Sequence, residues 1–413
     1  MISRRDFLTR SMAVVSLGVA VPGVFAKAAL AARAEASAGA ARTLVVVQLA
    51  GGVDGLNALV PYASPAYRDN RPRLGIPEDE VLPIGDGFGF HPALADFKAL
   101  LDAGHLAVVQ GAGYPNPNFS HFKAMDIWQS ADPEGKAASG WLGRYFDGLV
   151  DASGHPLAGL SIGRSLPRAF QAEEATLPAV GSLESFALQG PGNSADAGPR
   201  RAGLLRMYDV YRPAGTPFAA LLDATLDGAV QSSAELIAAH AAYEPAVAYP
   251  DSSLATGLRL LAELIDSGEG ASPLRVGHVT LGGFDTHAQQ PAVLEGLLAQ
   301  LGAALSAFWQ DVVAHGHEDE VLVMTWSEFG RRVRENANLG TDHGSVGPMF
   351  LIGNALKPGL HGDPPSLTDL DDGNLRYTVD FRSVYAAVLE GWLEAPADEI
   401  LGAHFEPVDV FKT

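Results

Sequence analysis

Residues 42–57 read RTLVVVQLAGGVDGLN, and this stretch sets the class of fold. Its first half is a run of apolar, mostly β-branched residues, without the polar alternation that is typical of a half-exposed strand. The run therefore predicts a strand at 42–49 that is buried on both faces. The two glycines and Asp54 that follow predict a turn at the carboxyl end of that strand.

Similar apolar runs recur along the chain and alternate with helical patterns. Strands are predicted at 106–110, 160–162, 276–281, 320–325 and 349–352. Helices are predicted at 92–103, 121–130, 217–228, 232–242, 252–267, 291–316 and 380–393. This alternation predicts an α/β fold with a mostly parallel central sheet and helices on both faces. We expect one domain over 41–413, in which 163–215 forms an insertion or cap.

The first 40 residues resemble a twin-arginine export signal. Arg4 and Arg5 precede Phe7 and Leu8, an apolar stretch follows at 12–25, and small residues suited to cleavage come next. The apolar stretch is short for a membrane span. The alternative is an amphipathic first helix. The resemblance predicts a periplasmic or secreted protein, with the twin-arginine export machinery as a partner and no membrane span in the mature chain.

Composition excludes several kinds of chemistry. The 413 residues carry a formal net charge of −20, which argues against nucleic acid or an anionic membrane as a partner. The chain has no cysteine, so disulfides, iron–sulfur clusters and cysteine nucleophiles are excluded. Any metal ion must be held by oxygen and nitrogen ligands.

Polar side chains gather at the ends of the predicted strands. Because ligands of open α/β sheets bind outside the carboxyl ends of the strands, we expect these side chains to meet at one edge. The predicted metal ligands are Asp54, Asn57, Asp285, His287, Glu328, Asp342 and His343. Mixed ligands of this kind suit a divalent ion, namely zinc, manganese or magnesium. One ion is expected, with two ions as the alternative.

Three further residues are predicted to be catalytic. Ser120 stands before a helical run, where its hydroxyl is a candidate nucleophile and the helix N-terminus favours an anion. His121 is a candidate ligand or base. Arg331, with Arg332 beside it, is placed to pair with a small anionic or ester substrate.

Structural interpretations of the same residues stay open. Asp54 also fits a simple turn, and Ser120 fits a helix cap. His121 also fits a half-buried position on the helix. Glu328 also fits a charge at a helix start, with Arg331 and Arg332 as its partners.

A resemblance to a known family rests on five short segments: AGGVDGLN, NPNFSHF, GGFDTH, WSEFGRR and TDHG. They resemble the domain-of-unknown-function family 1501 of exported bacterial proteins, which in turn resembles the alkaline phosphatase/sulfatase superfamily. That resemblance implies an alkaline phosphatase-like fold. By order along the chain, it implies that Asp54 is the first metal ligand, Ser120 the nucleophile, Asp285 and His287 a middle pair, and His343 the last histidine.

The chain departs from the superfamily pattern at one place. Glu328-Phe329 stands where an Asp-His pair is usual, so one ligand is missing or replaced, unless Asp342-His343 is that pair shifted along the chain. The absence of cysteine, and of a Cys/Ser-x-Pro-x-Arg motif after Ser120, argues against a formylglycine sulfatase.

Three functions are compatible with the sequence. The first, which we favour, is an exported metal-dependent hydrolase of phosphate- or sulfate-type esters. The second is a metal-free serine hydrolase that uses Ser120, although no G-x-S-x-G turn surrounds it. The third is a non-catalytic binding or assembly protein on a degenerate phosphatase-like scaffold.

Overall fold

The first predicted strand lies in the middle of the main sheet. In the computed structural model, β1 (Thr43–Ala50) is buried along its whole length except at Ala50. It pairs in parallel with β8 (Val276–Gly282) on one side and with β9 (Val321–Trp326) on the other. The structure describes residues 42–149, 157–181, 239–267 and 274–412.

The main sheet is mostly parallel, as predicted. Among its described strands, only β10 (Gly347–Ile352) runs against its neighbours, β9 and β5 (Leu106–Gly113). The order across the sheet is β11 (Gly359–His361), β5, β10, β9, β1, β8, β6 (Gly159–Ile162) and β7 (Ala179–Val180), and β14 (Val379–Asp380) also pairs with β5.

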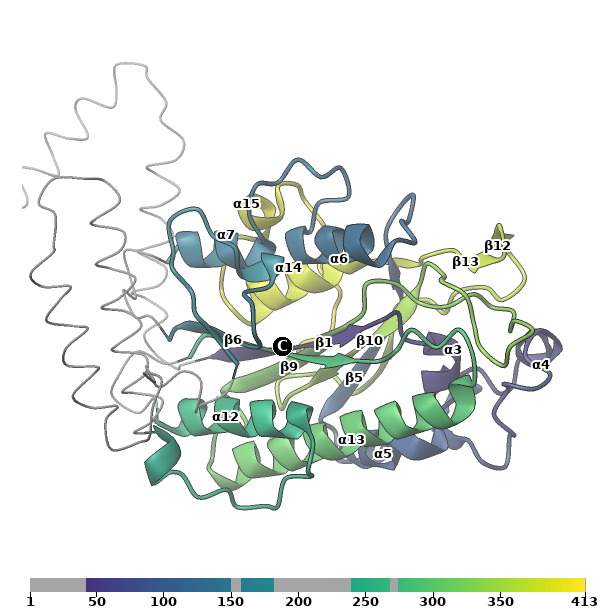
Figure 1. The fold of residues 1–413 in the computed structure, drawn as a ribbon, viewed down its shortest axis with the longest axis horizontal. Coiled ribbons are helices and arrows are strands. Elements are labelled where there is room, and N and C mark those ends of the chain that lie inside the picture. Colours follow the sequence, from purple (N-terminus) through teal and green to yellow (C-terminus); the bar gives the residue numbers. More distant parts are fainter. Residues whose placement is uncertain (1–41, 150–156, 182–238, 268–273, 413) are drawn as a thin grey trace, which may run out of the picture.

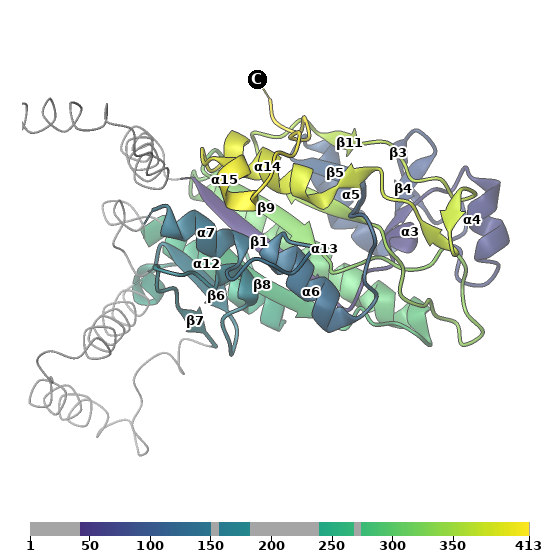
Figure 2. The same ribbon diagram turned by 90° about the horizontal axis from the view of Figure 1, so that it is seen from above.

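Helices cover both faces of this sheet (Figure 1). On one face lie α5 (Ala95–Asp102), α12 (Ser253–Ser267) and α13 (Gln290–Ala314). On the other lie α6 (His121–Ser130), α7 (Trp141–Asp147), α14 (Phe381–Gly391) and α15 (Ala397–Leu401), which Figure 2 shows from above. The predicted α/β class with helices on both faces is therefore confirmed.

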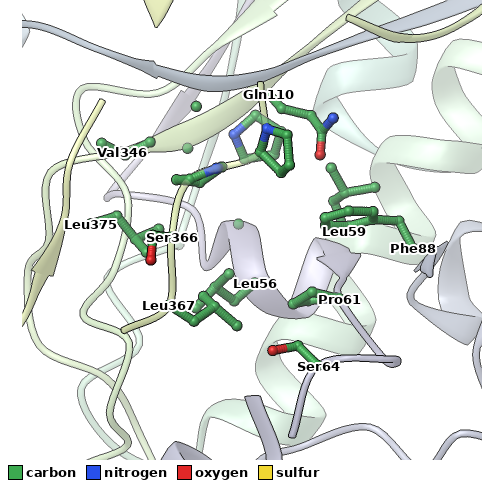
Figure 3. Close-up of a pocket in the computed structure, with 16 residues that line it drawn as sticks. Leu56, Leu59, Pro61, Ser64, Phe88, Gln110, Val346, Ser366, Leu367 and Leu375 are labelled. Carbon is green, nitrogen blue, oxygen red and sulfur yellow. The ribbon is translucent and has the colours of Figure 1, made fainter. Parts of the chain in front are cut away.

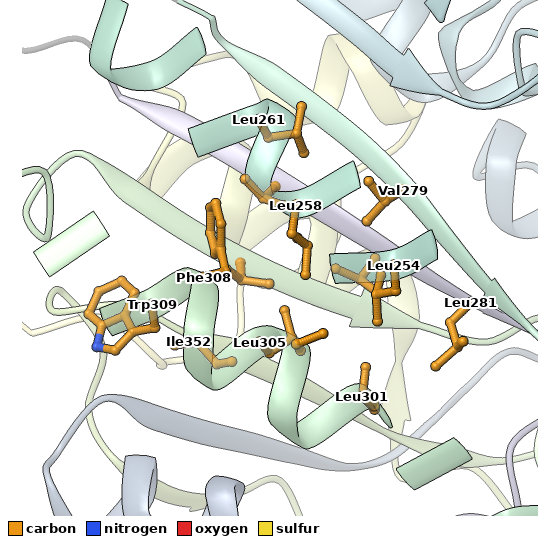
Figure 4. Close-up of a cluster of buried hydrophobic side chains, with 14 of the residues drawn as sticks. Leu254, Leu258, Leu261, Val279, Leu281, Leu301, Leu305, Phe308, Trp309 and Ile352 are labelled. Atoms are coloured by element: carbon orange, nitrogen blue, oxygen red, sulfur yellow. The ribbon is translucent and has the colours of Figure 1, made fainter. Parts of the chain in front are cut away.

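Each face of β1 belongs to a separate hydrophobic core because successive side chains of a strand point to opposite faces. Val45 and Val47 pack in the core under α12 and α13, which Figure 4 shows in part. Leu44 and Val46 pack in the core under α6, α7 and α14. A strand that is buried on both faces must be apolar at every position, which explains the continuous run in the sequence.

Helix α13 is long and apolar enough to cross a membrane by length and composition. In the structure it lies along the sheet, and Leu298, Leu301, Leu305 and Phe308 are fully buried in the core. Its apolar character is therefore explained by packing against the sheet.

Several sequence predictions fall wholly or partly outside the described residues. They concern the export signal at 1–40, the helix at 217–228, most of the helix at 232–242, and 182–215 of the predicted cap. These stay predictions. The described part of the predicted cap, 163–181, adds the edge strand β7 to the main sheet.

A small sheet beside the main one was not predicted. It consists of β2 (Leu59–Val60), β4 (Phe88–Phe90) and β3 (Leu82–Gly85), and it lies next to α3 (Gly55–Ala58) and α4 (Pro65–Asn70). Strands of two to four residues are too short to show a periodic pattern in the sequence.

Candidate metal centre

Five chain segments meet at one edge of the main sheet. The segments after β1, β8 and β9 arrive there because these parallel strands all end at that edge. The segment before β10 arrives there because β10 is antiparallel, so its beginning lies where its neighbours end. The fifth segment is the start of α6, which follows β5.

Gly51 allows two of these segments to approach closely. Its φ of +120° lies in the region that favours glycine, and a Cβ at this position would lie 2.5 Å from the backbone nitrogen of Asp285. The glycine pair after β1 therefore places the loop that carries Asp285 against the end of the central strand.

Three histidines converge on the carboxylate of Asp285. The Nε2 atoms of His287 and His343 each lie 3.1 Å from Asp285 Oδ1 and 2.9 Å from each other. His121 Nε2 lies 3.4 Å from Asp285 Oδ2. Ligand atoms of His121, Asp285 and His343 all lie within 4.8 Å of one another.

The Nδ1 atom of each histidine faces an oxygen that accepts a hydrogen bond. His121 Nδ1 lies 2.8 Å from Glu328 Oε1, and His287 Nδ1 lies 3.2 Å from Asp342 Oδ1. His343 Nδ1 lies 2.7 Å from the carbonyl oxygen of Phe119. Because these oxygens only accept, a neutral ring carries its proton on Nδ1 and has a lone pair on Nε2.

These tautomers place three nitrogen lone pairs against one carboxylate. A cation between such groups would attract all of them, and His121 Nε2 is buried with no hydrogen-bond partner among the described residues. In an octahedral site with bonds of ~2.1 Å, neighbouring ligand atoms lie ~3.0 Å apart. The spacings of 2.9, 3.1 and 3.1 Å among His287, His343 and Asp285 match that geometry. The four residues therefore form a candidate metal site.

The carboxylate of Asp285 is held in its charged form. Partial burial opposes ionisation, but the hydrogen bond and the positive charge of Arg331 outweigh it and lower the pKa of Asp285 to about 2. Hydrogen bonds from Asn336 and His287 likewise outweigh burial and lower the pKa of Asp342. Asp285 therefore stays anionic well below neutral pH.

Arg331 does not face a substrate, contrary to the prediction. Its side chain is fully buried, and it donates to Asp285 Oδ1 at 2.7 Å. The Nη2 atom that makes this bond also faces the backbone carbonyl oxygens of Gly51 and Phe284, while Nε and Nη1 donate to those of Gly52 and Thr341. Arg331 thus joins the loops of the site and orients Asp285. The exposed neighbour Arg332 pairs with Asp372 at 3.5 Å.

Asp54 and Asn57 lie apart from the four converging residues, so their predicted role as metal ligands is not supported. The buried carboxylate of Asp54 pairs with the guanidinium of Arg71 and accepts from the Gln290 amide. The Asn57 amide oxygen accepts from Arg71 and from Tyr67, each at 2.8 Å. Both residues belong to a buried network that fixes the loop after β1.

Glu328 and Asp342 each stand behind one of the converging histidines. Glu328 is buried, and its Oε1 atom accepts from the backbone nitrogen of Gly51 and faces His121 Nδ1, both at 2.8 Å. Asp342 accepts from His287. A carboxylate behind a ligating imidazole fixes the tautomer and the ring orientation. The predicted ligands Glu328 and Asp342 are therefore better described as positioning residues.

Ser120 lies between two residues of the site. Phe119 before it accepts the hydrogen bond of His343, and His121 after it faces Asp285. Ser120 is exposed, and its side chain forms no capping bond at the start of α6. The alternative in which Ser120 caps the helix through its side chain is therefore not observed.

Two contributors to the site had no signal in the sequence. The ring of Phe329 lies 4.9 Å from the His121 ring and 4.6 Å from the His343 ring, centroid to centroid, and so supports both. Arg71 reaches Asp54 across 17 positions of sequence. Neither contact follows from spacing along the chain, because both depend on the three-dimensional path of a loop.

The family described as "Protein of unknown function (DUF1501)" matches residues 106–375. The chain belongs to this family. The matched range contains all four converging residues as well as Glu328 and Asp342. The family membership predicted from the short segments is thus confirmed, and the family description assigns no activity. No curated protein matches the sequence.

Solved structures that resemble the chain include members of the expected superfamily. The C-terminal periplasmic domain of EcEptC from Escherichia coli, in complex with zinc, is 10% identical over 77% of this chain and 74% of that one, with a TM-score of 0.36. The sulfatase PsFucS1 from Pseudoalteromonas sp. is 13% identical over 95% and 75%, with a TM-score of 0.37. A protein in the alkaline phosphatase superfamily from Vibrio parahaemolyticus is 9% identical over 78% and 62%, with a TM-score of 0.36. Because these scores are low, the fold assignment rests on the strand order and directions given above.

Proposed function

We propose that His121, Asp285, His287 and His343 bind one divalent metal ion and that this centre hydrolyses an anionic ester. The observation that carries the proposal is the convergence of three Nε2 lone pairs on one carboxylate, with each ring fixed from behind by its own acceptor. Such an arrangement is costly without a cation and favourable with one.

The ligand set narrows the choice of metal. Three imidazoles among four ligands suit zinc, and the carboxylate with the octahedral spacing also admits manganese, whereas magnesium prefers oxygen ligands and retains its water. The Oδ2 atom of Asp54 pairs with the guanidinium of Arg71, whose positive charge disfavours a second cation there, although Oδ1 is buried without a partner among the described residues. We therefore propose one zinc or manganese ion instead of two ions or magnesium.

When bound, such an ion supplies Lewis-acid chemistry, which polarises an ester oxygen and stabilises the negative charge that develops there. Other residues of the chain orient the proposed ligands. Glu328 and Asp342 keep the proton of His121 and His287 on Nδ1, and Arg331 holds the carboxylate of Asp285 in place.

The start of α6 favours an anionic substrate. The first backbone N–H groups of a helix have no partner within the helix, and Ser120 does not cap them. The helix has 10 residues, and its first residue is the proposed ligand His121. An anionic group beside the metal therefore meets both the helix N-terminus and the Ser120 hydroxyl, which we propose as the nucleophile.

Hydrolysis of three chromogenic esters tests this function. The substrates are p-nitrophenyl phosphate, bis(p-nitrophenyl) phosphate and p-nitrophenyl sulfate, tested with metal-free protein and after addition of zinc or manganese. We expect metal-dependent turnover of at least one ester. His343→Ala should lower kcat/KM by at least about 100-fold, and Ser120→Ala should lower it by about 1000-fold without loss of metal.

The matched control is His404→Ala, which removes an exposed histidine that pairs with Asp398. Activity that survives a chelator and the His343→Ala change, but not the Ser120→Ala change, would identify the metal-free serine hydrolase instead. Metal binding without turnover of any ester would favour the binding or assembly protein. Export by the twin-arginine route is a further part of the proposal, and cell fractionation of a form with Arg4→Lys and Arg5→Lys tests it.

A further inference from the structure

A cavity lies beside the small sheet (Figure 3), and none of its lining residues belongs to the candidate metal centre. Its volume is about 290 Å³. The walls come from α3, β2, β4, β5, the beginning of β10 and the segment 364–367. We propose that this cavity binds a small, neutral, mostly apolar molecule that donates one hydrogen bond to the side chain of Gln110.

The lining excludes a charged ligand. None of the 16 described residues that line the cavity carries an ionisable side chain. Leucine, proline, valine and phenylalanine side chains supply most of the wall, including Leu56, Leu59 and Phe88. A charged group would lose its hydration here without gaining a partner, whereas an apolar group gains from burial.

Gln110 supplies the polar contact. The side chain is buried, with 4% of its surface exposed, and its Oε1 atom has no hydrogen-bond partner among the described residues. Its Nε2 atom donates to the carbonyl oxygen of Gly362 at 3.5 Å. Because that carbonyl only accepts, it favours the orientation in which the amide nitrogen faces Gly362. Figure 3 shows the amide oxygen turned toward Leu59.

An unpaired buried acceptor is uncommon in a folded protein and calls for a donor. No donor of the described residues reaches Oε1, so a bound molecule that carries an N–H or O–H group can supply one. A ligand with one N–H or O–H group and an otherwise apolar body meets both the acceptor and the wall. Ser64 and Ser366 are the other polar side chains of the lining. A mostly apolar site with a few polar groups is typical of small-molecule pockets.

Volume limits the size of the ligand. One water occupies ~30 Å³ of liquid, so the cavity corresponds to ~10 non-hydrogen atoms. The wall is also preformed. It contains Gly55, whose Cβ position lies 2.5 Å from the Pro348 ring, and two further prolines at 364 and 365. Indole and benzofuran have the right size, and they differ mainly in that only indole carries an N–H donor.

A comparison of these two probes tests the proposal. Binding of indole and of benzofuran to the full-length protein is measured by titration with a chelator present, so that the result is independent of the metal centre. We expect indole to bind roughly fivefold more tightly than benzofuran, which corresponds to one neutral hydrogen bond. In Gln110→Leu this preference should vanish, and in Gln310→Leu, an exposed position on α13, it should persist.

Two results would overturn the proposal. One is a wild-type result without the expected preference. Equal affinity for both probes would remove the role of the hydrogen bond, and binding of neither at millimolar concentration would indicate a cavity that holds only water. The other is an indole preference that persists in Gln110→Leu. The wild-type comparison does not depend on the folding of any variant. Leu367→Trp, which fills the cavity, should weaken binding of both probes and so places them there.

Discussion

At the residue scale, the role of a polar side chain is decided by what stands behind it. Asp285 and Asp54 are both aspartates that follow a strand of the central sheet, and the sequence predicted the same role for both. Asp285 faces three imidazoles, whereas Asp54 faces the buried guanidinium of Arg71. The strand–glycine–aspartate pattern gives the position of each carboxylate, but its partner depends on how the loops fold.

The pair of Asp54 and Arg71 yields a test at this scale. Both side chains are fully buried, so Asp54→Asn leaves a buried charge without its counter-ion. We expect the free energy of unfolding to fall by about 3 kcal/mol or more, while the bound metal stays unchanged. Urea unfolding and metal content measure the two effects.

The control is Asp102→Asn, which removes an exposed i,i+4 pair with Lys98 and should change stability by less than about 0.5 kcal/mol. Loss of the metal in Asp54→Asn would instead return Asp54 to the ligand set.

At the scale of elements, the direction of one strand completes the site. His343 precedes β10, so it reaches the edge where the other strands end only because β10 runs antiparallel to β9 and β5. Six predicted strands are present within a few residues of their expected bounds, because apolar runs bounded by glycine mark buried strands. Strand direction leaves no such trace in the sequence, and neither does a two-residue strand such as β2.

Strand β8 carries a buried histidine with a predictable effect of pH on stability. His278 is 3% exposed, its Nδ1 atom lies 3.1 Å from Ser161 Oγ, and burial lowers its pKa to about 4. The unfolded chain therefore binds one more proton than the folded chain between about pH 6.5 and pH 4.

The stability that depends on a neutral, buried His278 is fully present above pH 6.5 and is lost as the pH falls toward 4. Between pH 7.5 and pH 4.5 this loss should lower the free energy of unfolding by roughly 2–3 kcal/mol. Urea unfolding of the wild type and of His278→Gln, both without metal, isolates it, since the other titrating groups are common to both proteins. Parallel pH profiles for the two proteins would contradict the assignment.

At the scale of the whole molecule, one sheet with two covered faces leaves its carboxyl edge free for chemistry. Composition and alternation predicted this architecture, because the formation of layers depends on apolar periodicity that is visible in the sequence. They also predicted which strand ends carry the site. They did not separate ligands from the residues that orient them: of the seven predicted ligands, the structure brings only Asp285, His287 and His343 together, and it adds His121.

The central claim is that these four residues bind one metal ion, and calorimetric titration of the metal-free protein with zinc and manganese tests it most directly. We predict one equivalent bound by the wild type and by His404→Ala, and none by His343→Ala or Asp285→Asn, with circular dichroism used to show that both variants are folded. Binding of the ion with unchanged stoichiometry and affinity in folded His343→Ala and Asp285→Asn, or no binding by the wild type, would contradict the account.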